Sequence, residues 1–275
     1  MSKLKKSAKF VLILIGVAAA TFFAVRIHDV SQMPPLDRWH QYVPTELSVK
    51  ETDSSDWAGY LAAEEKIFRA VRTEVSDKLS PESKTPFNRY YEGSLIYPPG
   101  YAQDWNRSYV LAPAGKPVGA VVLLHGLTDS PYSLRHIARR YAAAGFVVVA
   151  IRLPGHGTVP AGLSNVQWDE WMAATRLAVR EARRLTDPAA PLHLVGFSNG
   201  GALAVKYALD AIEDTQLARP DRLILLSPMI GITRFARLAG VAGLPALLPS
   251  FSKAAWLSIV PEFNPFKYNS FPVNG

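Results

Sequence analysis

The feature that most constrains this chain is a G-x-S-x-G pentapeptide, Gly196-Phe197-Ser198-Asn199-Gly200, which separates two segments of different character. The apolar run 192–195 before it predicts a short buried parallel strand. The residues 202–208 after it predict a helix. A serine at such a strand-to-helix turn has a strained backbone and an exposed hydroxyl, and the flanking glycines let the strand and the helix approach closely. The pattern predicts that Ser198 is a nucleophile; the alternative is an ordinary structural turn.

A second apolar run, Ala120–Leu124, predicts another buried strand, and it ends in His125-Gly126-Leu127. Acyl transfer needs two hydrogen-bond donors directed at the oxygen that becomes negative in the tetrahedral intermediate. We expect one donor to be the backbone N–H of Asn199, the residue after the candidate nucleophile. The other is expected to be the N–H of Leu127, because Gly126 allows the backbone to turn inward. The two stretches together predict an oxyanion hole.

The chain resembles the α/β-hydrolase family, specifically its esterase, monoacylglycerol-lipase-like and serine-aminopeptidase-like members, over roughly residues 108–264. The resemblance rests on His125-Gly126-Leu127, on Arg152-Leu153-Pro154-Gly155-His156-Gly157 and on Gly196 to Gly200, in the family's order. It implies an α/β fold with a doubly wound, mostly parallel sheet and a helical cap. It also implies that Gly126, Gly196 and Gly200 support the site, and that His125 braces the oxyanion loop. His156 is likewise expected to pack in its loop near the site, although either histidine could still serve as a base.

Strand-like apolar runs alternate with helical periodicity along the middle of the chain, which is typical of a parallel sheet. We expect strands over 108–112, 146–151 and 222–227, and helices over 131–144 and 167–185. The expected domains are a membrane anchor or signal segment over 1–30, a tether and amphipathic helical extension over 31–105, the hydrolase core over 106–230 and an incomplete cap over 231–275.

The N-terminus has a basic segment followed by sixteen uncharged, mostly apolar residues, Phe10–Val25. As a helix this run spans roughly 24 Å, and the flanking Lys9 and Arg26 can extend their charges to the membrane surface. An uncleaved signal anchor is favoured because the apolar run continues beyond the small residues 18–20, where a secretory signal would be cleaved. The basic end should stay cytoplasmic. We therefore expect a single-pass, membrane-anchored protein with its domain on the outer side, or a secreted one if the signal is cleaved.

Composition excludes several other classes of protein. A chain of 275 residues that is 49% hydrophobic can bury one sizeable core and an accessory segment. The absence of cysteine excludes disulfides and a thiolate nucleophile. Net charge is +7, but four of those charges are lysines before the apolar run, so no nucleic-acid partner is expected. No dinucleotide or P-loop glycine motif and no metal-ligand spacing occurs, so neither a cofactor nor a metal is expected.

The segment after Ser227 is rich in Leu, Ala, Gly and Pro, and aromatic residues follow at close intervals from Phe251 to Phe271. In the resembling family this position carries a cap over the active site. An apolar, aromatic cap suits an acyl chain or an aromatic ester better than a charged substrate; a plain helical connection is the alternative. The function expected is hydrolysis of small, lipid-like or apolar carboxylic esters through an acyl-enzyme on Ser198.

A catalytic serine requires a base, and the base requires an orienting carboxylate. In the resembling family both follow the nucleophile, whereas all six histidines here precede Ser198. We therefore expect the acid and the base to lie beyond Gly275, and residues 1–275 alone to be inactive and poorly stable. Two alternatives stay open: a non-catalytic relative that binds or acts as a scaffold, and an enzyme that recruits His125 or His156 as its base.

Overall fold

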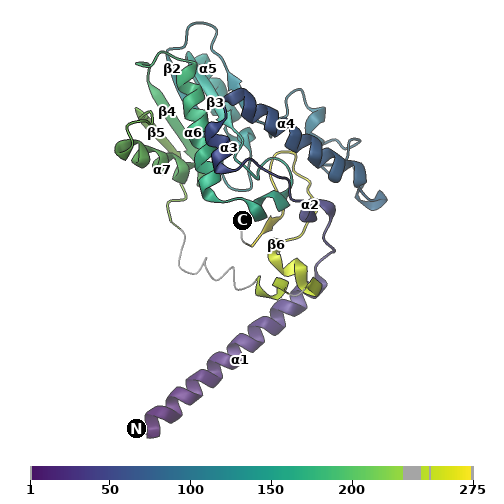
Figure 1. Cartoon of the computed structure of the whole chain (residues 1–275). Helices are drawn as coiled ribbons and strands as arrows, with labels where there is room; N and C mark the ends of the chain where they lie inside the picture. Colours follow the sequence, from purple (N-terminus) through teal and green to yellow (C-terminus); the bar gives the residue numbers. More distant parts are fainter. Residues whose placement is uncertain (1, 232–242, 248, 274–275) are drawn as a thin grey trace.

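The computed structural model describes residues 2–231, 243–247 and 249–273. Its centre is a five-stranded sheet with the strand order β1-β3-β2-β4-β5 (Figure 1). The strands are β1 (Tyr109–Leu111), β2 (Gly119–Leu124), β3 (Phe146–Ile151), β4 (Leu192–Phe197) and β5 (Arg222–Leu226). β1 runs antiparallel to β3, and the other pairs are parallel. The expected α/β fold with a mostly parallel sheet is confirmed.

Helices cover both faces of the sheet because its central strands are apolar on both sides. Every residue of β2 is buried. Val121 and Leu123 pack toward the face covered by α5 (Arg135–Ala143). Val122 and Leu124 pack toward the other face, which α6 (Trp168–Arg184) and α7 (Asn199–Glu213) cover. A strand buried on both faces is the normal pattern of a parallel sheet.

The predicted elements of this core agree with the structure to within a few residues. The helix expected over 131–144 begins as a 3-10 turn, η4 (Pro131–Leu134), before α5. The helix expected over 167–185 is α6, whose first turn is closed by a capping box between Gln167 and Glu170. A further short turn, η5 (Pro160–Asn165), connects β3 to α6.

The stretch expected to be a tether at the start of the N-terminal extension is folded. Two short helices, α2 (Arg38–Gln41) and α3 (Val49–Ser54), occupy this stretch, and Trp39 is buried against Tyr90 with ring centroids 5.3 Å apart. The predicted amphipathic helix is α4 (Trp57–Glu74), which Asp56 caps by accepting a hydrogen bond from Gly59 N–H. Three 3-10 turns follow: η1 (Ser76–Lys78), η2 (Pro81–Ser83) and η3 (Pro98–Gly100). The sequence did not indicate this packing, because the partners of these residues lie far away in the chain.

The first helix, α1 (Ser2–Gln32), projects from the body and continues past the expected end of the apolar run (Figure 1). This helix is long and apolar enough to cross a membrane, and a signal sequence can have the same length and composition. Its last turns are joined to the C-terminal segment, since Arg26 Nη2 donates to the carbonyls of Ala254 (3.3 Å) and Trp256 (3.1 Å) and Val30 is buried. The helix is thus connected directly to the folded body.

The expected cap lies partly outside the described residues, which omit 232–242, 248 and 274–275. The described part contains two 3-10 segments, η7 (Leu244–Leu247) and η8 (Pro249–Ala255). They are followed by a two-stranded antiparallel ribbon of β6 (Trp256–Ser258) and β7 (Phe271–Pro272). The described part of this segment therefore includes strands as well as helical turns.

Candidate active site

Ser198 lies at the turn between the end of β4 and the start of α7, at the carboxyl end of the sheet. Its backbone has φ 52° and ψ −116°, a conformation that residues with a side chain rarely adopt. The turn is held on both sides, because Ser198 N–H donates to Leu226 O and the Ser198 carbonyl accepts from Met229 N–H, each at 2.9 Å. The end of β5 and the residues after it therefore support a strained serine.

The glycines around Ser198 are required by close contacts between the elements. A Cβ on Gly196 would overlap the Gly200 carbonyl oxygen, and one on Gly200 would overlap the Leu124 carbonyl oxygen. Gly201, which the sequence pattern did not single out, is also confined, since its Cβ would lie 2.7 Å from Pro228 Cβ. α7 thus begins directly against the ends of β2 and β4.

The loop after β2 lies beside the serine. A Cβ on Gly126 would lie 3.3 Å from Ser198 Cβ, and Thr128 turns the loop back with φ 59°. Asn199 is buried as the first residue of α7, where a backbone N–H has no acceptor inside the helix. The structure therefore brings Asn199 and the Gly126–Leu127 segment to the same serine.

His125 is fully buried, and the backbone engages both of its ring nitrogens. Nε2 accepts a hydrogen bond from Leu153 N–H at 3.0 Å, so Nδ1 carries the proton and donates to Gly126 O at 2.9 Å. Burial lowers the pKa of His125 to about 4, which keeps the ring neutral. The imidazole holds the loop after β2 against the loop after β3.

His156 is also fully buried in the loop after β3. Its Nδ1 lies 3.0 Å from Pro154 O, and its ring packs edge-on against Trp171, with centroids 5.5 Å apart. Burial, reinforced by His125, lowers the pKa of His156 to about 3. Among the residues that the structure describes, no histidine makes a hydrogen bond to the Ser198 hydroxyl.

The C-terminal segment packs on the candidate oxyanion loop, an arrangement that the sequence did not indicate. Ser130 Oγ donates to Phe266 O and Tyr268 N–H donates to Thr128 O, both at 2.8 Å. Asp129 between them is buried and accepts from Ser133 Oγ at 2.7 Å. Burial raises the pKa of Asp129. The two partners of each bond to the C-terminal segment, Ser130 with Phe266 and Thr128 with Tyr268, are more than 130 positions apart in the chain. No local sequence pattern could therefore have revealed these contacts.

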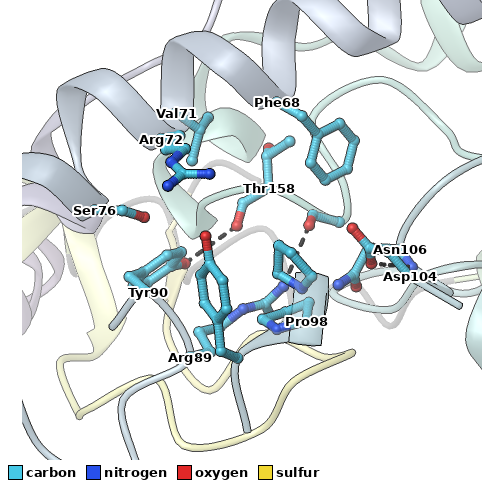
Figure 2. Close-up of a pocket in the computed structure, with 13 residues that line it drawn as sticks. Phe68, Val71, Arg72, Ser76, Arg89, Tyr90, Pro98, Asp104, Asn106 and Thr158 are labelled. Atoms are coloured by element: carbon cyan, nitrogen blue, oxygen red, sulfur yellow. Dashed lines mark hydrogen bonds between the residues drawn. The ribbon is translucent and has the colours of Figure 1, made fainter. Parts of the chain in front are cut away.

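A separate cavity of about 60 Å³ lies between the extension and the loop after β3 (Figure 2). Phe68 and Val71 of α4 form one wall, and Arg89 and Asn106 contribute polar groups. Arg89 is buried and ties two segments together, donating to Lys267 O and Gly157 O at 3.2 Å each. Ser198 does not line this cavity, so it is not part of the candidate site.

Within the described part of the chain, no group of three or more His, Cys, Asp or Glu side chains is placed to hold a metal ion.

The family model described as serine aminopeptidase, S33, matches residues 115–261, more than half of the chain. The chain belongs to this family of α/β hydrolases. The matched segment contains both the His125–Leu127 loop and the turn at Ser198. The resemblance drawn from the three sequence motifs is confirmed.

Two curated relatives and one solved structure illustrate the similarity. The thermostable monoacylglycerol lipase of Bacillus sp. (strain H-257) is 37% identical over 92 residues, 34% of this chain and 35% of that protein. Phospholipase YtpA of Bacillus subtilis (strain 168) is 26% identical over 151 residues, 53% of this chain and 55% of that protein. A structure from work on the metagenome-derived lipolytic enzymes LipS and LipT matches with a TM-score of 0.50 and 25% identity, covering 64% of this chain and 66% of that one.

The chain thus spans between about a third and two thirds of the length of these relatives. It is lipase- and esterase-like in sequence and fold. The residues before 115, which include α1 to α4 and β1, lie outside the family match.

Proposed function

We propose that Ser198 is the nucleophile of a serine hydrolase that cleaves carboxylic esters. The observation that carries the proposal is the strained, positive-φ backbone of Ser198 on the β4–α7 turn, with Gly126 packed against it. Ser198 Oγ attacks the ester carbonyl, and the negative oxygen that forms accepts hydrogen bonds from the N–H groups of Leu127 and Asn199. The alcohol then leaves, and water releases the acid from the acyl-enzyme.

The hydroxyl must lose its proton as it attacks, so the proposal requires a base and an acid. His125 uses both ring nitrogens to hold two loops, and the pKa values of His125 and His156 are lowered to about 4 and about 3. A group with so low a pKa is a weak proton acceptor at neutral pH. We propose that the base and the acid come from outside the described residues, and that residues 1–275 alone are inactive.

The proposed substrate is a lipid-like or apolar carboxylic ester. The relatives that match are named as a monoacylglycerol lipase, a phospholipase and lipolytic enzymes. Aromatic residues of the C-terminal segment also pack near the loop that carries Leu127, where Phe266 stacks on Tyr132, and aromatic surroundings suit an apolar ester.

We further propose that residues 10–25 of α1 anchor the protein in a membrane by a single span, with the domain on the outer side. The apolar side chains of this stretch are not covered by the rest of the protein. Such a helix is stable when lipid surrounds these side chains in place of water. The proposed units are the anchor over 1–30, the extension over 31–105, the hydrolase core over 106–230 and the cap over 231–275. Secretion after cleavage near Ala20 is the alternative.

A fluorophosphonate probe tests the nucleophile. The protein is expressed in two forms: residues 1–275, and a longer form that adds any coding sequence after codon 275. Each form is made with wild-type Ser198 and with Ser198→Ala. Ser227→Ala is the matched control, because Ser227 directly follows the neighbouring strand β5 and also has a positive φ of 46°. We expect labelling and short-chain ester hydrolysis in the longer form only, lost with Ser198→Ala and kept with Ser227→Ala. Labelling of another serine that survives Ser198→Ala would contradict the assignment.

A second function, a binding or scaffold module, is favoured by one observation: no described histidine makes a hydrogen bond to the Ser198 hydroxyl. This alternative predicts a folded protein that the fluorophosphonate probe does not label in either its 275-residue or its longer form. The labelling experiment therefore separates the two functions.

A further inference from the structure

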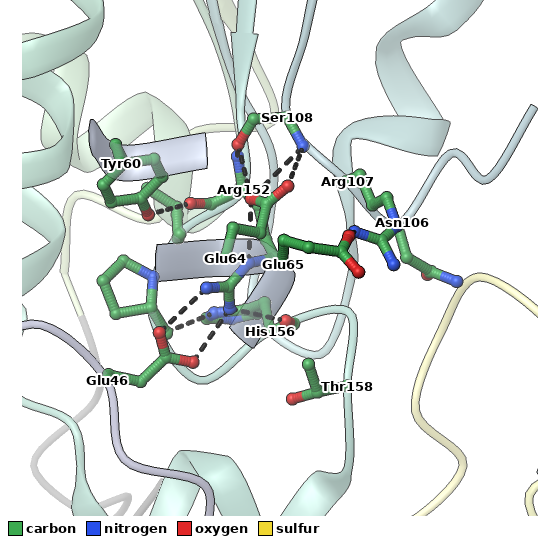
Figure 3. A network of polar contacts seen from close by, with 12 residues as sticks. Glu46, Tyr60, Glu64, Glu65, Asn106, Arg107, Ser108, Arg152, His156 and Thr158 are labelled. Atoms are coloured by element: carbon green, nitrogen blue, oxygen red, sulfur yellow. Dashed lines mark hydrogen bonds and ion pairs between the residues drawn. The ribbon is translucent and has the colours of Figure 1, made fainter. Parts of the chain in front are cut away.

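Three charged side chains, Arg152, Glu46 and Glu64, meet in the interior between the N-terminal extension and the sheet (Figure 3). Arg152 follows β3 and is only 1% exposed, and the two carboxylates are also buried. Glu64 lies on α4, and Glu46 lies in the connection between α2 and α3. Both acids thus come from the part of the chain outside the family match.

The guanidinium of Arg152 is held by both acids. Its Nη1 and Nη2 donate to the two oxygens of Glu46, each at 2.8 Å, and its Nε donates to Glu64 at 3.1 Å. Burial raises the pKa of Glu64, and the nearby guanidinium opposes that rise. A buried ion pair carries a large desolvation cost, so its net contribution to stability is small even with good geometry. What the arrangement provides is a fixed position for Arg152.

The same side chains fix the backbone of the loop after β3. Glu46 also accepts a hydrogen bond from Gly155 N–H at 2.8 Å, and Arg152 Nη1 donates to His156 O at 3.0 Å. Arg152 N–H donates to Ser108 Oγ at 2.8 Å, and Tyr60 OH donates to Arg152 O at 2.7 Å. The loop 152–157 is therefore held by contacts from the extension on several sides.

This loop is bonded in turn to the candidate oxyanion loop. Leu153, the residue after Arg152, donates its N–H to His125 Nε2, and this bond leaves the proton on Nδ1 for the contact with Gly126 O. Gly126 packs against Ser198. A continuous path of contacts runs from Glu46 through Arg152 and Leu153 to His125 and the backbone that carries Leu127.

We infer that Glu46 is a positioning residue for the Ser198 site. It holds the loop 152–157 and, through Leu153 and His125, sets the direction of the Gly126–Leu127 backbone. The extension thereby helps to position the backbone of the Ser198 site. The inference rests on the proposed function for its catalytic consequence, whereas the path of contacts is open to test without activity.

The variant that tests it is Glu46→Gln, which keeps the shape and an acceptor for Gly155 N–H but removes the charge that Arg152 binds. Glu65→Gln is the matched control. Glu65 is next to Glu64 on α4, but it points away from Arg152 and pairs with Arg107 at 2.6 Å (Figure 3). Glu46→Ala, which removes both contacts, is the stronger variant.

Hydrogen–deuterium exchange of the 275-residue protein is the first measurement. We expect Glu46→Gln to speed exchange in residues 153–157 and also in residues 125–127, with Glu46→Ala larger and Glu65→Gln unchanged. Faster exchange confined to 153–157, or unchanged exchange in both segments, would overturn the inference whatever the activity of the protein.

The second measurement uses the form that fluorophosphonate labels. We expect Glu46→Gln to lower the labelling rate and kcat by about tenfold or more while KM changes little. A misplaced oxyanion donor stabilises the transition state less but affects the binding of the substrate little. Equal rates in Glu46→Gln and Glu65→Gln would overturn the positioning role. Labelling that survives Ser198→Ala would instead contradict the proposed nucleophile and leave the exchange result to decide the coupling.

Discussion

Tyr132 and Phe266 stack with their ring centroids 4.1 Å apart and their planes only 15° from parallel. Tyr132 lies in η4, shortly after the loop that carries Leu127, and Phe266 belongs to the C-terminal segment. The hydrogen bond from Ser130 Oγ to Phe266 O accompanies the stack. The C-terminal segment therefore forms part of the support of the candidate oxyanion loop.

Replacing Phe266 with Ala should destabilise this support. Phe266 is 6% exposed, and removal of a buried phenyl ring costs about 3 kcal/mol, through lost burial and the cavity left behind. Phe263→Ala is the matched control, because Phe263 is 56% exposed. Chemical denaturation should show the loss for Phe266→Ala alone. Equal midpoints for the two variants would show that the stack contributes no stability.

Gly200→Ala should prevent the turn at Ser198 from forming. The added Cβ would overlap the Leu124 carbonyl oxygen, which belongs to a central strand and cannot move aside. We expect a loss of about 3 kcal/mol or more, seen as a lower melting temperature or as insoluble protein. Gly115→Ala is the control, since no atom lies within 4 Å of its added Cβ. A Gly200→Ala protein that melts like the wild type would contradict the close approach of α7 to β2.

The core strands and the turn at Ser198 could be predicted from the sequence because their signals are local. The run Ala120–Leu124 is apolar throughout, and the glycines beside Ser198 stand at the spacing typical of a tight strand-to-helix turn. The pair of Glu46 and Arg152 gave no such signal. These residues are 106 positions apart, and a glutamate in a proline-containing stretch is typical of a solvated loop. For the same reason the packing of Trp39 on Tyr90 was not predicted.

Deleting residues 2–25 should release the protein from the membrane fraction. The deletion removes the apolar run but keeps Arg26 and Val30, which contact the body. We expect the shortened protein to be soluble and the full chain to sediment with membranes. Protease added to intact spheroplasts should digest the domain of the full chain. A soluble mature protein that begins near Thr21 would indicate a cleaved signal instead.

The last prediction concerns Glu262, whose buried carboxylate makes stability depend on pH. Burial raises the pKa of Glu262 to about 7, although Arg89 opposes the rise. Its oxygens accept hydrogen bonds from Asn269 N–H at 3.0 Å and Ser270 N–H at 2.8 Å. The folded protein therefore binds a proton more tightly than the unfolded chain, in which a glutamate has a pKa of about 4.3. The stability from this proton is full below about pH 4.3 and is lost as the pH rises through about 7.

Glu262→Gln removes this titration while keeping a neutral group in place. Between pH 5 and pH 8, the wild type should lose stability relative to Glu262→Gln. This loss should reach at most on the order of 3 kcal/mol, because folding raises the pKa of Glu262 from about 4.3 to about 7. The buried histidines with lowered pKa values also change stability with pH, but they act in both proteins, so the difference between the two isolates Glu262. The exposed Glu213→Gln serves as the control and should follow the wild type at every pH. Urea denaturation at several pH values measures the difference, and a gap between wild type and Glu262→Gln that stays constant from pH 5 to pH 8 would show that Glu262 does not titrate in this range.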